Sequence, residues 1–253
     1  GVIYYQRKGS GLNMLDNMKK RDMLKHKLDR INKLDLIFES VAEAAEKQLQ
    51  DRLLKHREIQ GFWGDKYHEI ELSVCRNEEE LEKAGNEYSY AEWDVETVEY
   101  ELLSILEMRI VHLYKSYELL LKSILKSLDV DISQVRTIND IKVKYRDYGV
   151  DLDSVESYQA SYELRLVNNS IKHSTLISDK VKVELPEFSN ASVFEYSALS
   201  QFLERTKPLL TNHVSQLIDS LKLVLDNNND AELNEIVTPT QALCAFAASR
   251  RNI

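Results

Sequence analysis

The stretch "VEYELLSILEMRIVHLYKSYELLLKSIL", residues 98–125, decides the fold class. Its apolar residues recur three or four positions apart, which is the spacing of one buried face on an α-helix. The chain holds only seven glycines and three prolines in 253 residues, so few sharp turns interrupt such a pattern. The sequence therefore predicts an all-α fold. The expected buried stripe of a helix over residues 89–128 is Val98, Leu102, Ile105, Leu113, Leu120, Ile124 and Leu128.

A second amphipathic stretch precedes this helix. Apolar residues at helical spacing run from Met14 to about Gln60, and "GFWGD" at residues 61–65 is expected to stop the helix. At 1.5 Å per residue such a helix is roughly 70 Å long, which is too long to bury on one compact domain. We therefore expect residues 14–62 to form an assembly arm that pairs with another chain or forms a coiled coil.

Two short segments alternate apolar and polar residues in the manner of strands. "YHEIELSVC", residues 67–75, suits a short strand, and Asn77 with Glu80 reads as a capping box for a brief helix after it. "KVKVEL", residues 180–185, suits one arm of a small β-hairpin. A helix over residues 133–148 is expected to end at the glycine that follows it.

Two more helices complete the predicted order. Asp153 and Glu156 form a capping box that opens a helix over residues 154–173, and Ser192 with Glu195 caps a last long helix that reaches about Asp226, with Pro208 breaking or kinking it. The predicted organisation is a flexible or tag-derived segment (1–13), the arm (14–62), an irregular connector (63–88), a helical bundle (89–226) and a polar C-terminal tail (227–253).

Charge is unevenly distributed along the chain. The formal net charge of −9 argues against a general nucleic-acid coat, which needs Lys and Arg to displace counterions. Residues 1–35 nevertheless carry nine basic residues against four acidic ones, and residues 69–107 carry thirteen acids against two bases. These segments are either solvated helix faces or, for the basic one, a contact for RNA or an acidic partner.

The composition also limits the cellular location and the kinds of functional site that we expect. Cys75 and Cys244 match no metal spacing, and no run of about 18 apolar residues occurs, so we expect a cytoplasmic protein without a membrane segment. The pattern of Asp226, Asn228 and Asp230 lacks the glycine and glutamate of a calcium loop. There is no Gly-rich phosphate loop and no serine elbow, and we expect neither a metal nor a cofactor.

The stretch "ELRLVNNSIKHS", residues 163–174, has the strongest chemical character. At about 100° per residue its polar residues share one arc of about 140°, opposite an apolar stripe. Paired asparagines and a histidine are poorer helix formers than the Glu and Lys of an ordinary solvent-exposed helix face. They offer hydrogen bonds, and the histidine can exchange a proton near neutral pH. The arc holds Arg165, Asn168, Asn169, Lys172 and His173, and Tyr158 and Ser161 extend it toward the start of the helix.

This motif and the order of helices around it resemble HEPN domains, compact all-α bundles that are common in prokaryotic toxin–antitoxin and antiviral defence systems. The resemblance covers roughly residues 89–226, where "LRLVNNSIKHS" stands for a family pattern of Arg, a polar residue, a few others and His. It implies a metal-independent endoribonuclease that forms a composite site between two copies. Carried over, His173 is the acid or base and Asn169 the orienting residue, while Asn168 occupies the arginine position.

Arg165 lies one turn before Asn168 on the same face, about 12 Å along the axis from His173. Arg165 or Lys172 would then stabilise charge, and Asn168, Tyr158 and Ser161 would belong to an RNA-binding or dimer-forming face. Two interpretations remain within the resemblance: a working ribonuclease, or a degenerate RNA-binding module, with RNA such as tRNA, a second copy and a second defence protein as partners. The alternative is a non-enzymatic scaffold subunit that assembles through the N-terminal helix.

Overall fold

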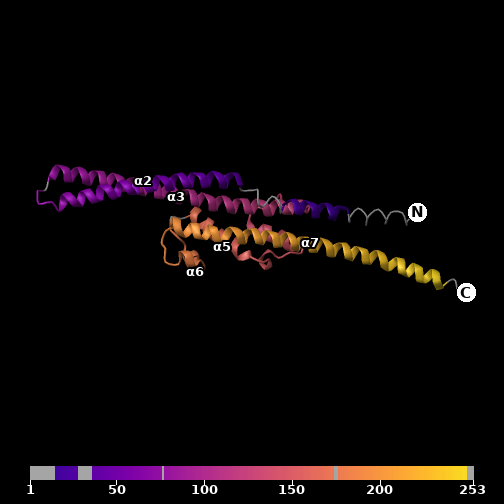
Figure 1. Ribbon diagram of the computed structural model, residues 1–253. Helices are drawn as coiled ribbons and strands as arrows, with labels where there is room; N and C mark the ends of the chain where they lie inside the picture. The colour runs from indigo at the N-terminus through magenta and orange to yellow at the C-terminus, as the bar shows by residue number, and fades with distance from the viewer. Residues whose placement is uncertain (1–14, 28–35, 76, 174–175, 250–253) are drawn as a thin grey trace. The chain divides into compact units, whose positions relative to one another are not determined.

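The computed structural model describes residues 15–27, 36–75, 77–173 and 176–249 (Figure 1). These residues form helices joined by turns and loops, without a strand among them, which confirms the predicted all-α fold class. A helix at residues 15–27 comes first. It is followed by α2 (Leu36–Glu71), α3 (Glu78–Ser127), α4 (Ile138–Asp147), η1 (Leu152–Ser154), α5 (Tyr158–His173), α6 (Asp179–Glu184), η2 (Pro186–Phe188) and α7 (Tyr196–Ser249).

The chain divides into two compact units. The first comprises the described residues of Gly1–Leu34, Ser116–Ser161 and Pro208–Ile253, and the second comprises those of Asp35–Lys115 and Tyr162–Lys207. Helices α3, α5 and α7 each contribute residues to both units.

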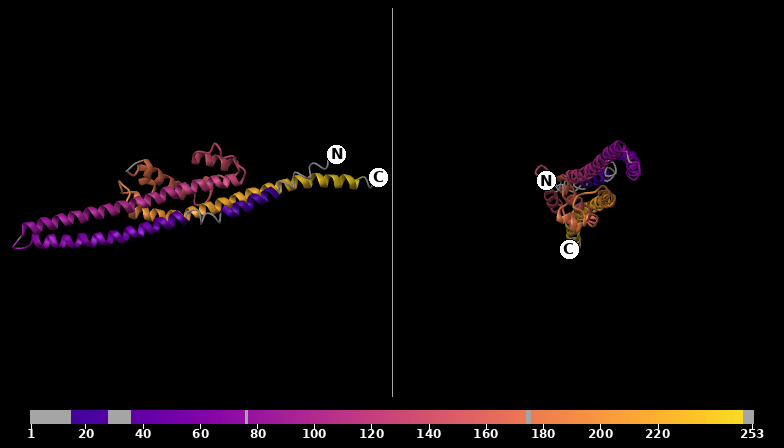
Figure 2. Two further views of the ribbon diagram at one scale, coloured as in Figure 1. Left: turned by 90° about the horizontal axis from the view of Figure 1, so that it is seen from above. Right: turned by 90° about the vertical axis from the view of Figure 1, so that its left-hand side faces the viewer.

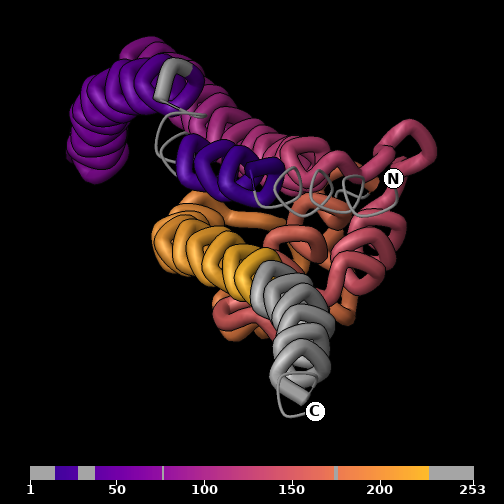
Figure 3. The backbone as a smooth tube through the Cα atoms, turned by 90° about the vertical axis from the view of Figure 1, so that its right-hand side faces the viewer, coloured from indigo at the N-terminus to yellow at the C-terminus, as the bar shows by residue number. Residues whose placement is uncertain are grey.

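In the first unit, the helix at residues 15–27 packs along the C-terminal part of α3 (Figure 3). Leu24 is fully buried, and Lys20 pairs with Asp129 just beyond the end of α3 at 3.1 Å. Helix α4 is tied to the same stretch of α3, because the buried Tyr145 hydroxyl donates to the Leu121 carbonyl at 2.9 Å. Burial raises the pKa of Tyr145 well above its ordinary value, so the phenol stays protonated and the bond persists.

In the second unit, α2 and the first part of α3 run antiparallel as a long helical hairpin (Figures 1 and 2). Small buried side chains such as Ala42, Ala84 and Ala91 allow the two helices to approach. Farther along the pair, the rings of Phe38 and His112 stack with their centroids 4.0 Å apart. The stripe predicted for α3 is confirmed, since all its members are buried except Ile105, which is half-buried.

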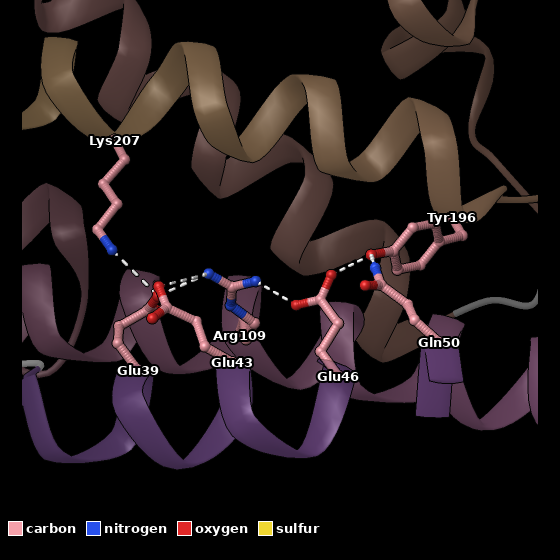
Figure 4. Close-up of polar contacts among 7 residues, drawn as sticks. All are labelled: Glu39, Glu43, Glu46, Gln50, Arg109, Tyr196 and Lys207. Carbon is pink, nitrogen blue, oxygen red and sulfur yellow. Dashed lines mark hydrogen bonds and ion pairs between the residues drawn. The ribbon is translucent and has the colours of Figure 1, made fainter. Parts of the chain in front are cut away.

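A network of charged and polar side chains joins α2, α3 and α7 inside the second unit (Figure 4). Arg109 bridges Glu39 at 2.7 Å and Glu46 at 2.6 Å, and Lys207 reaches Glu39 at 3.0 Å. Burial alone would raise the pKa of Glu39, but the hydrogen bonds from Arg109 and Lys207 outweigh it and lower the pKa. Burial and a hydrogen bond to Glu46 raise the pKa of Tyr196 to about 12.

The predicted stop at residues 61–65 is wrong, because α2 continues to Glu71. Gly64 serves packing rather than termination, since a Cβ there would lie 3.2 Å from the Tyr88 ring. The predicted strand at residues 67–75 is helical up to Glu71 and then turns, and the connector at residues 63–88 is helical over 63–71 and 78–88. Asn77 does act as a cap, since its Oδ1 accepts from the amides of Glu79 and Glu80, but the helix it opens is α3.

The predicted hairpin arm at residues 180–185 is also wrong, because the segment forms α6. Ser178 caps it by accepting the Val181 amide at 3.4 Å. Val181 and Leu185 are four residues apart and fully buried, whereas Val183 between them is 85% exposed. A short alternating pattern therefore fits a helix whose apolar residues lie at i and i+4.

The bounds of the last two long helices differ from expectation. Asp151 caps the short turn η1 and Ser157 has a positive φ of 61°, so α5 begins at Tyr158 rather than at 154. Helix α7 begins at Tyr196 and continues through Pro208 to Ser249, so the predicted break is absent and the predicted tail is helical to that residue. The junction at residues 28–35, which the sequence predicts to be helical, lies outside the described residues.

Candidate functional site

The C-terminal half of α5 presents most of the predicted site residues. Asn169, Lys172 and His173 are exposed and Arg165 is partly exposed, while Leu164 and Val167 on the opposite side are fully buried. One face of α5 therefore packs into the second unit and the other offers an amide, an imidazole and two cationic groups to solvent. His173 and Lys172 lie in the last turn, where the helix dipole favours positive charge.

Asn168 does not belong to this exposed face. It is only 1% exposed, and its Nδ2 donates to the Oδ1 of Asn169 at 3.2 Å. The buried Oδ1 of Asn168 has no hydrogen-bond partner among the described residues. Within the predicted arc, Asn168 is the residue nearest the apolar stripe, so its side chain is buried with the packed side of the helix. The Asn168 amide thus packs inward and donates a hydrogen bond to its neighbour.

Tyr162 organises the cationic groups at the start of the face. The Arg165 guanidinium carbon lies 5.5 Å from the centre of the Tyr162 ring, and the Lys180 ammonium of α6 lies 5.3 Å from it. Both separations are within the range of cation–π attraction. A hydrogen bond to Tyr162 raises the pKa of Lys180, so this side chain remains a cation. Helix α6 therefore adds a charge that the sequence pattern did not indicate.

Hydrogen bonds fix α6 beside α5. The Tyr162 hydroxyl donates to Glu184 at 3.0 Å, and the Ser178 amide donates to the buried Ser170 hydroxyl at 3.4 Å. These contacts hold Lys180 next to the exposed face of α5, because they connect both ends of α6 to that helix.

The acidic residue of α5 is neutralised on the inner side. Glu163 is buried and accepts from Arg205 of α7 at 2.8 Å, and Arg205 also donates to Glu187 at 2.7 Å. With this carboxylate paired, the outward charges of α5 are all positive.

Tyr158 and Ser161 lie in the first unit and are turned inward. The Tyr158 ring is 5.8 Å from the ring of the fully buried His213 and 4.8 Å from the Lys142 ammonium. Ser161 is buried and its hydroxyl donates to the Tyr158 carbonyl at 2.8 Å. The predicted place of these two residues on the binding face is therefore not what the structure shows, because both are engaged in packing. The residues that share the exposed side of α5 are Arg165, Asn169, Lys172 and His173, and Lys180 joins Arg165 at the Tyr162 ring.

Sequence reasoning missed Lys180 and Tyr162. Lys180 was hidden because its segment was interpreted as a strand, although Ser178 followed by Asp179 is a usable helix-start signal. Tyr162 lies about one turn before Arg165, and no local pattern marks it as a binding residue. Arg165 is three residues away on the same helix, whereas only the docking of α6 brings the second cation, Lys180, to the ring.

Neither a metal-binding cluster nor a membrane-spanning helix occurs in the described part of the chain. No three His, Cys, Asp or Glu side chains gather there in a way that could hold a metal ion. None of the described helices combines the length and apolar character needed to cross a membrane.

The fold and the exposed face define an all-helical protein with a cationic, histidine-containing helix end. A scan of family models finds no matching family, and searches of curated proteins and of solved structures find no match to this chain.

Proposed function

We propose that this protein is a HEPN-like factor of a prokaryotic defence or toxin system, and that the exposed end of α5 binds and cleaves RNA without a metal. The observation that carries the proposal is the shared exposure of Asn169, Lys172 and His173 at the end of α5, with the cations Arg165 and Lys180 at the Tyr162 ring earlier on the same helix. Phosphodiester groups are bound by such cations, and an exposed imidazole supplies proton transfer.

Asn168 departs from the family pattern, so the proposed activity needs its positive charge from other residues. In the family pattern the arginine position falls on Asn168, which cannot supply a permanent charge. Because Asn168 is 1% exposed, it does not face a substrate. Arg165 and Lys180, held over Tyr162, are the cations that would approach the phosphate instead.

The proposed reaction is an internal transfer at phosphorus. The ribose 2′-oxygen attacks the adjacent phosphorus as its proton passes to a base, the bond to the 5′-oxygen breaks, and an acid protonates that leaving oxygen. His173 fills one of these two roles, and His173 of a second copy fills the other in a composite site. Lys172 and the two cations over Tyr162 stabilise the negative charge that develops on the phosphoryl oxygens.

The direct test incubates the purified full chain with tRNA and with total RNA in excess EDTA. We expect cleavage that persists in EDTA and is lost in His173→Ala and reduced at least tenfold in Arg165→Ala. His26→Ala is the matched control, because His26 is an exposed helical histidine far from α5 in sequence and should leave the activity unchanged.

A gel-shift experiment on the same variants and on Lys180→Ala separates the two forms of the proposal. RNA binding that depends on Arg165 and Lys180 without cleavage identifies a binding module. Neither cleavage nor binding by the folded wild-type chain overturns the proposed function.

The α2–α3 hairpin favours a second candidate, a scaffold that assembles through this arm. Leu54, Phe62, Trp93 and Tyr100 are each at least 60% exposed on it, and aromatic side chains are enriched in protein–protein interfaces. Light scattering over a hundredfold dilution tests this candidate: a concentration-dependent mass that Phe62→Ser and Trp93→Ser abolish supports it, and a constant monomer mass removes it.

A further inference from the structure

A groove runs along one side of the α2–α3 hairpin in the second unit. It has a volume of about 1130 Å³ and is bounded by α2 between Arg57 and His68 and by α3 between Glu78 and Ser89. At 1.5 Å per residue this stretch of α2 spans about 16 Å, or three helical turns. Three of the chain's seven glycines, Gly61, Gly64 and Gly85, line it.

The protein's own packing accounts for two of these glycines. A Cβ added to Gly64 would lie 3.2 Å from the Tyr88 ring, and one added to Gly85 would lie 3.3 Å from the Tyr67 ring. Each glycine thus makes room for a tyrosine of the opposite helix, and both tyrosines line the groove.

Gly61 is not explained in this way. A Cβ there would meet no atom within 4 Å, although the residue lies inside a 36-residue helix. Apart from proline, glycine is the residue least favoured in a helix interior, so a fold that has room for a side chain gains nothing from it. A helix that approaches α2 closely from outside would require such an opening.

The charge of the groove indicates which kind of partner segment binds there. Its rim carries Asp65, Glu78 and Glu82, and the guanidinium of Arg57 is already bound to Glu99 at 2.6 Å. Residues 69–107, which include the α3 side of the groove, carry thirteen acids against two bases. A second copy of this groove would be repelled by like charge, whereas a basic segment would be attracted.

We propose that this groove binds a basic amphipathic α-helix of a partner protein. The partner lays a ridge of small or apolar residues over Gly61, and its Lys or Arg side chains reach Asp65 and Glu82. The chain's own basic helix at residues 15–27 is engaged elsewhere, since Arg21 pairs with Asp226 at 2.7 Å and Leu24 is fully buried. Among the described residues this helix is thus not the occupant, and the proposal commits to a segment of another protein.

The test uses the full chain and a defined probe, a fluorescein-labelled 18-residue helical peptide of Ala, Leu and Lys, with a Glu-for-Lys peptide as its opposite. Binding is followed by fluorescence anisotropy in 0.15 M NaCl. Gly61→Leu fills the groove where the fold leaves open space, and Ala44→Leu is its control on an exposed position of the same helix. Asp65→Asn with Glu82→Gln removes rim charge without adding volume.

We expect saturable binding of the Lys peptide, at least tenfold weaker in Gly61→Leu, several-fold weaker in the charge variant and unchanged in Ala44→Leu. Equal binding to wild type and Gly61→Leu, equal binding of the Glu peptide, or no saturable binding overturns the proposal. Self-association of the chain that Gly61→Leu abolishes also overturns it, because the occupant is then a second copy. If Gly61→Leu fails to fold by circular dichroism, the charge variant decides alone.

Discussion

Asn168 donates a hydrogen bond from its Nδ2 to the Oδ1 of Asn169 at 3.2 Å, and only Asn169 of the two is exposed. Because the Asn169 oxygen accepts this bond, its NH₂ group is the part left to face solvent. Asn168 is therefore the buried residue that orients its neighbour, and Asn169 is the exposed hydrogen-bond donor. An exposed amide donor beside Lys172 and His173 matches a ligand rich in hydrogen-bond acceptors, as a phosphodiester is.

This pair predicts that stability and RNA binding separate in two neighbouring variants. Asn169→Ala should change the free energy of unfolding by less than about 0.5 kcal/mol, as exposed substitutions usually do. It should also weaken RNA binding about tenfold, or about 1.4 kcal/mol. Asn168→Ala should lower the free energy of unfolding by about 1–3 kcal/mol, because it removes a hydrogen bond and leaves a cavity at a buried position. Urea unfolding and gel shifts measure the two effects. Equal loss of stability in both variants contradicts the assignment.

The Arg109 network predicts a large loss of stability in the second unit. Arg109→Met leaves Glu39 and Glu46 without their buried cation, and breaking one side of a buried ion pair typically costs about 3–5 kcal/mol. Glu43→Gln is the control, because this side chain is 63% exposed and 3.8 Å from Arg109, so its loss should cost less than about 0.5 kcal/mol. Urea denaturation of both variants checks the difference, and a small effect in Arg109→Met would contradict a structural role for the network.

His213 predicts a loss of stability on mild acidification. It is fully buried between Tyr117 and Tyr158, its Nδ1 lies 3.0 Å from the Glu156 carbonyl, and burial lowers its pKa below the ordinary value of 6.5. Below pH 6.5 the unfolded chain takes up a proton that the folded chain refuses, so the free energy of unfolding falls as pH falls from 6.5 toward the folded pKa.

His213→Asn keeps a side-chain donor for the Glu156 carbonyl but cannot titrate. Its free energy of unfolding should therefore show a flatter dependence on pH just below 6.5 than that of the wild type. Thermal melts in a buffer series from pH 7.5 to 5 measure both. Parallel curves for the two proteins would show that His213 is not the titrating group.

Gly61 and Gly64 form a matched pair one turn apart on α2. Gly61→Ala should raise the free energy of unfolding by about 0.5–1 kcal/mol, since nothing lies within 4 Å of the new methyl and alanine is favoured in helices. Gly64→Ala should gain less or lose stability, because its methyl would press on the Tyr88 ring at 3.2 Å. Thermal melts compare the stability of the two variants. A higher melting temperature for Gly64→Ala than for Gly61→Ala contradicts the packing described for the hairpin.

Local sequence patterns predicted that the long helices exist, although the ends of α2 and α7 differ from the prediction. The apolar period of residues 98–125 predicted α3 and its buried stripe, because a repeat sustained over many turns fits only one secondary structure. Short patterns failed at residues 67–75 and 180–185, since an alternation of a few residues also fits a helix that buries positions i and i+4. Gly61 and Gly64 were misread as a stop because the sequence does not show which ring lies across a glycine.

The sequence by itself determined the all-α class, the amphipathic period of the long helices and the gathering of Arg165, Asn169, Lys172 and His173 on one side of a helix. These features follow from the geometry of a single helix and need no knowledge of what packs against it. Tertiary structure alone decided that Asn168 turns inward and that Lys180 meets the Tyr162 ring. Both depend on which neighbouring helix covers each face, and burial is a property of that packing rather than of the local chain.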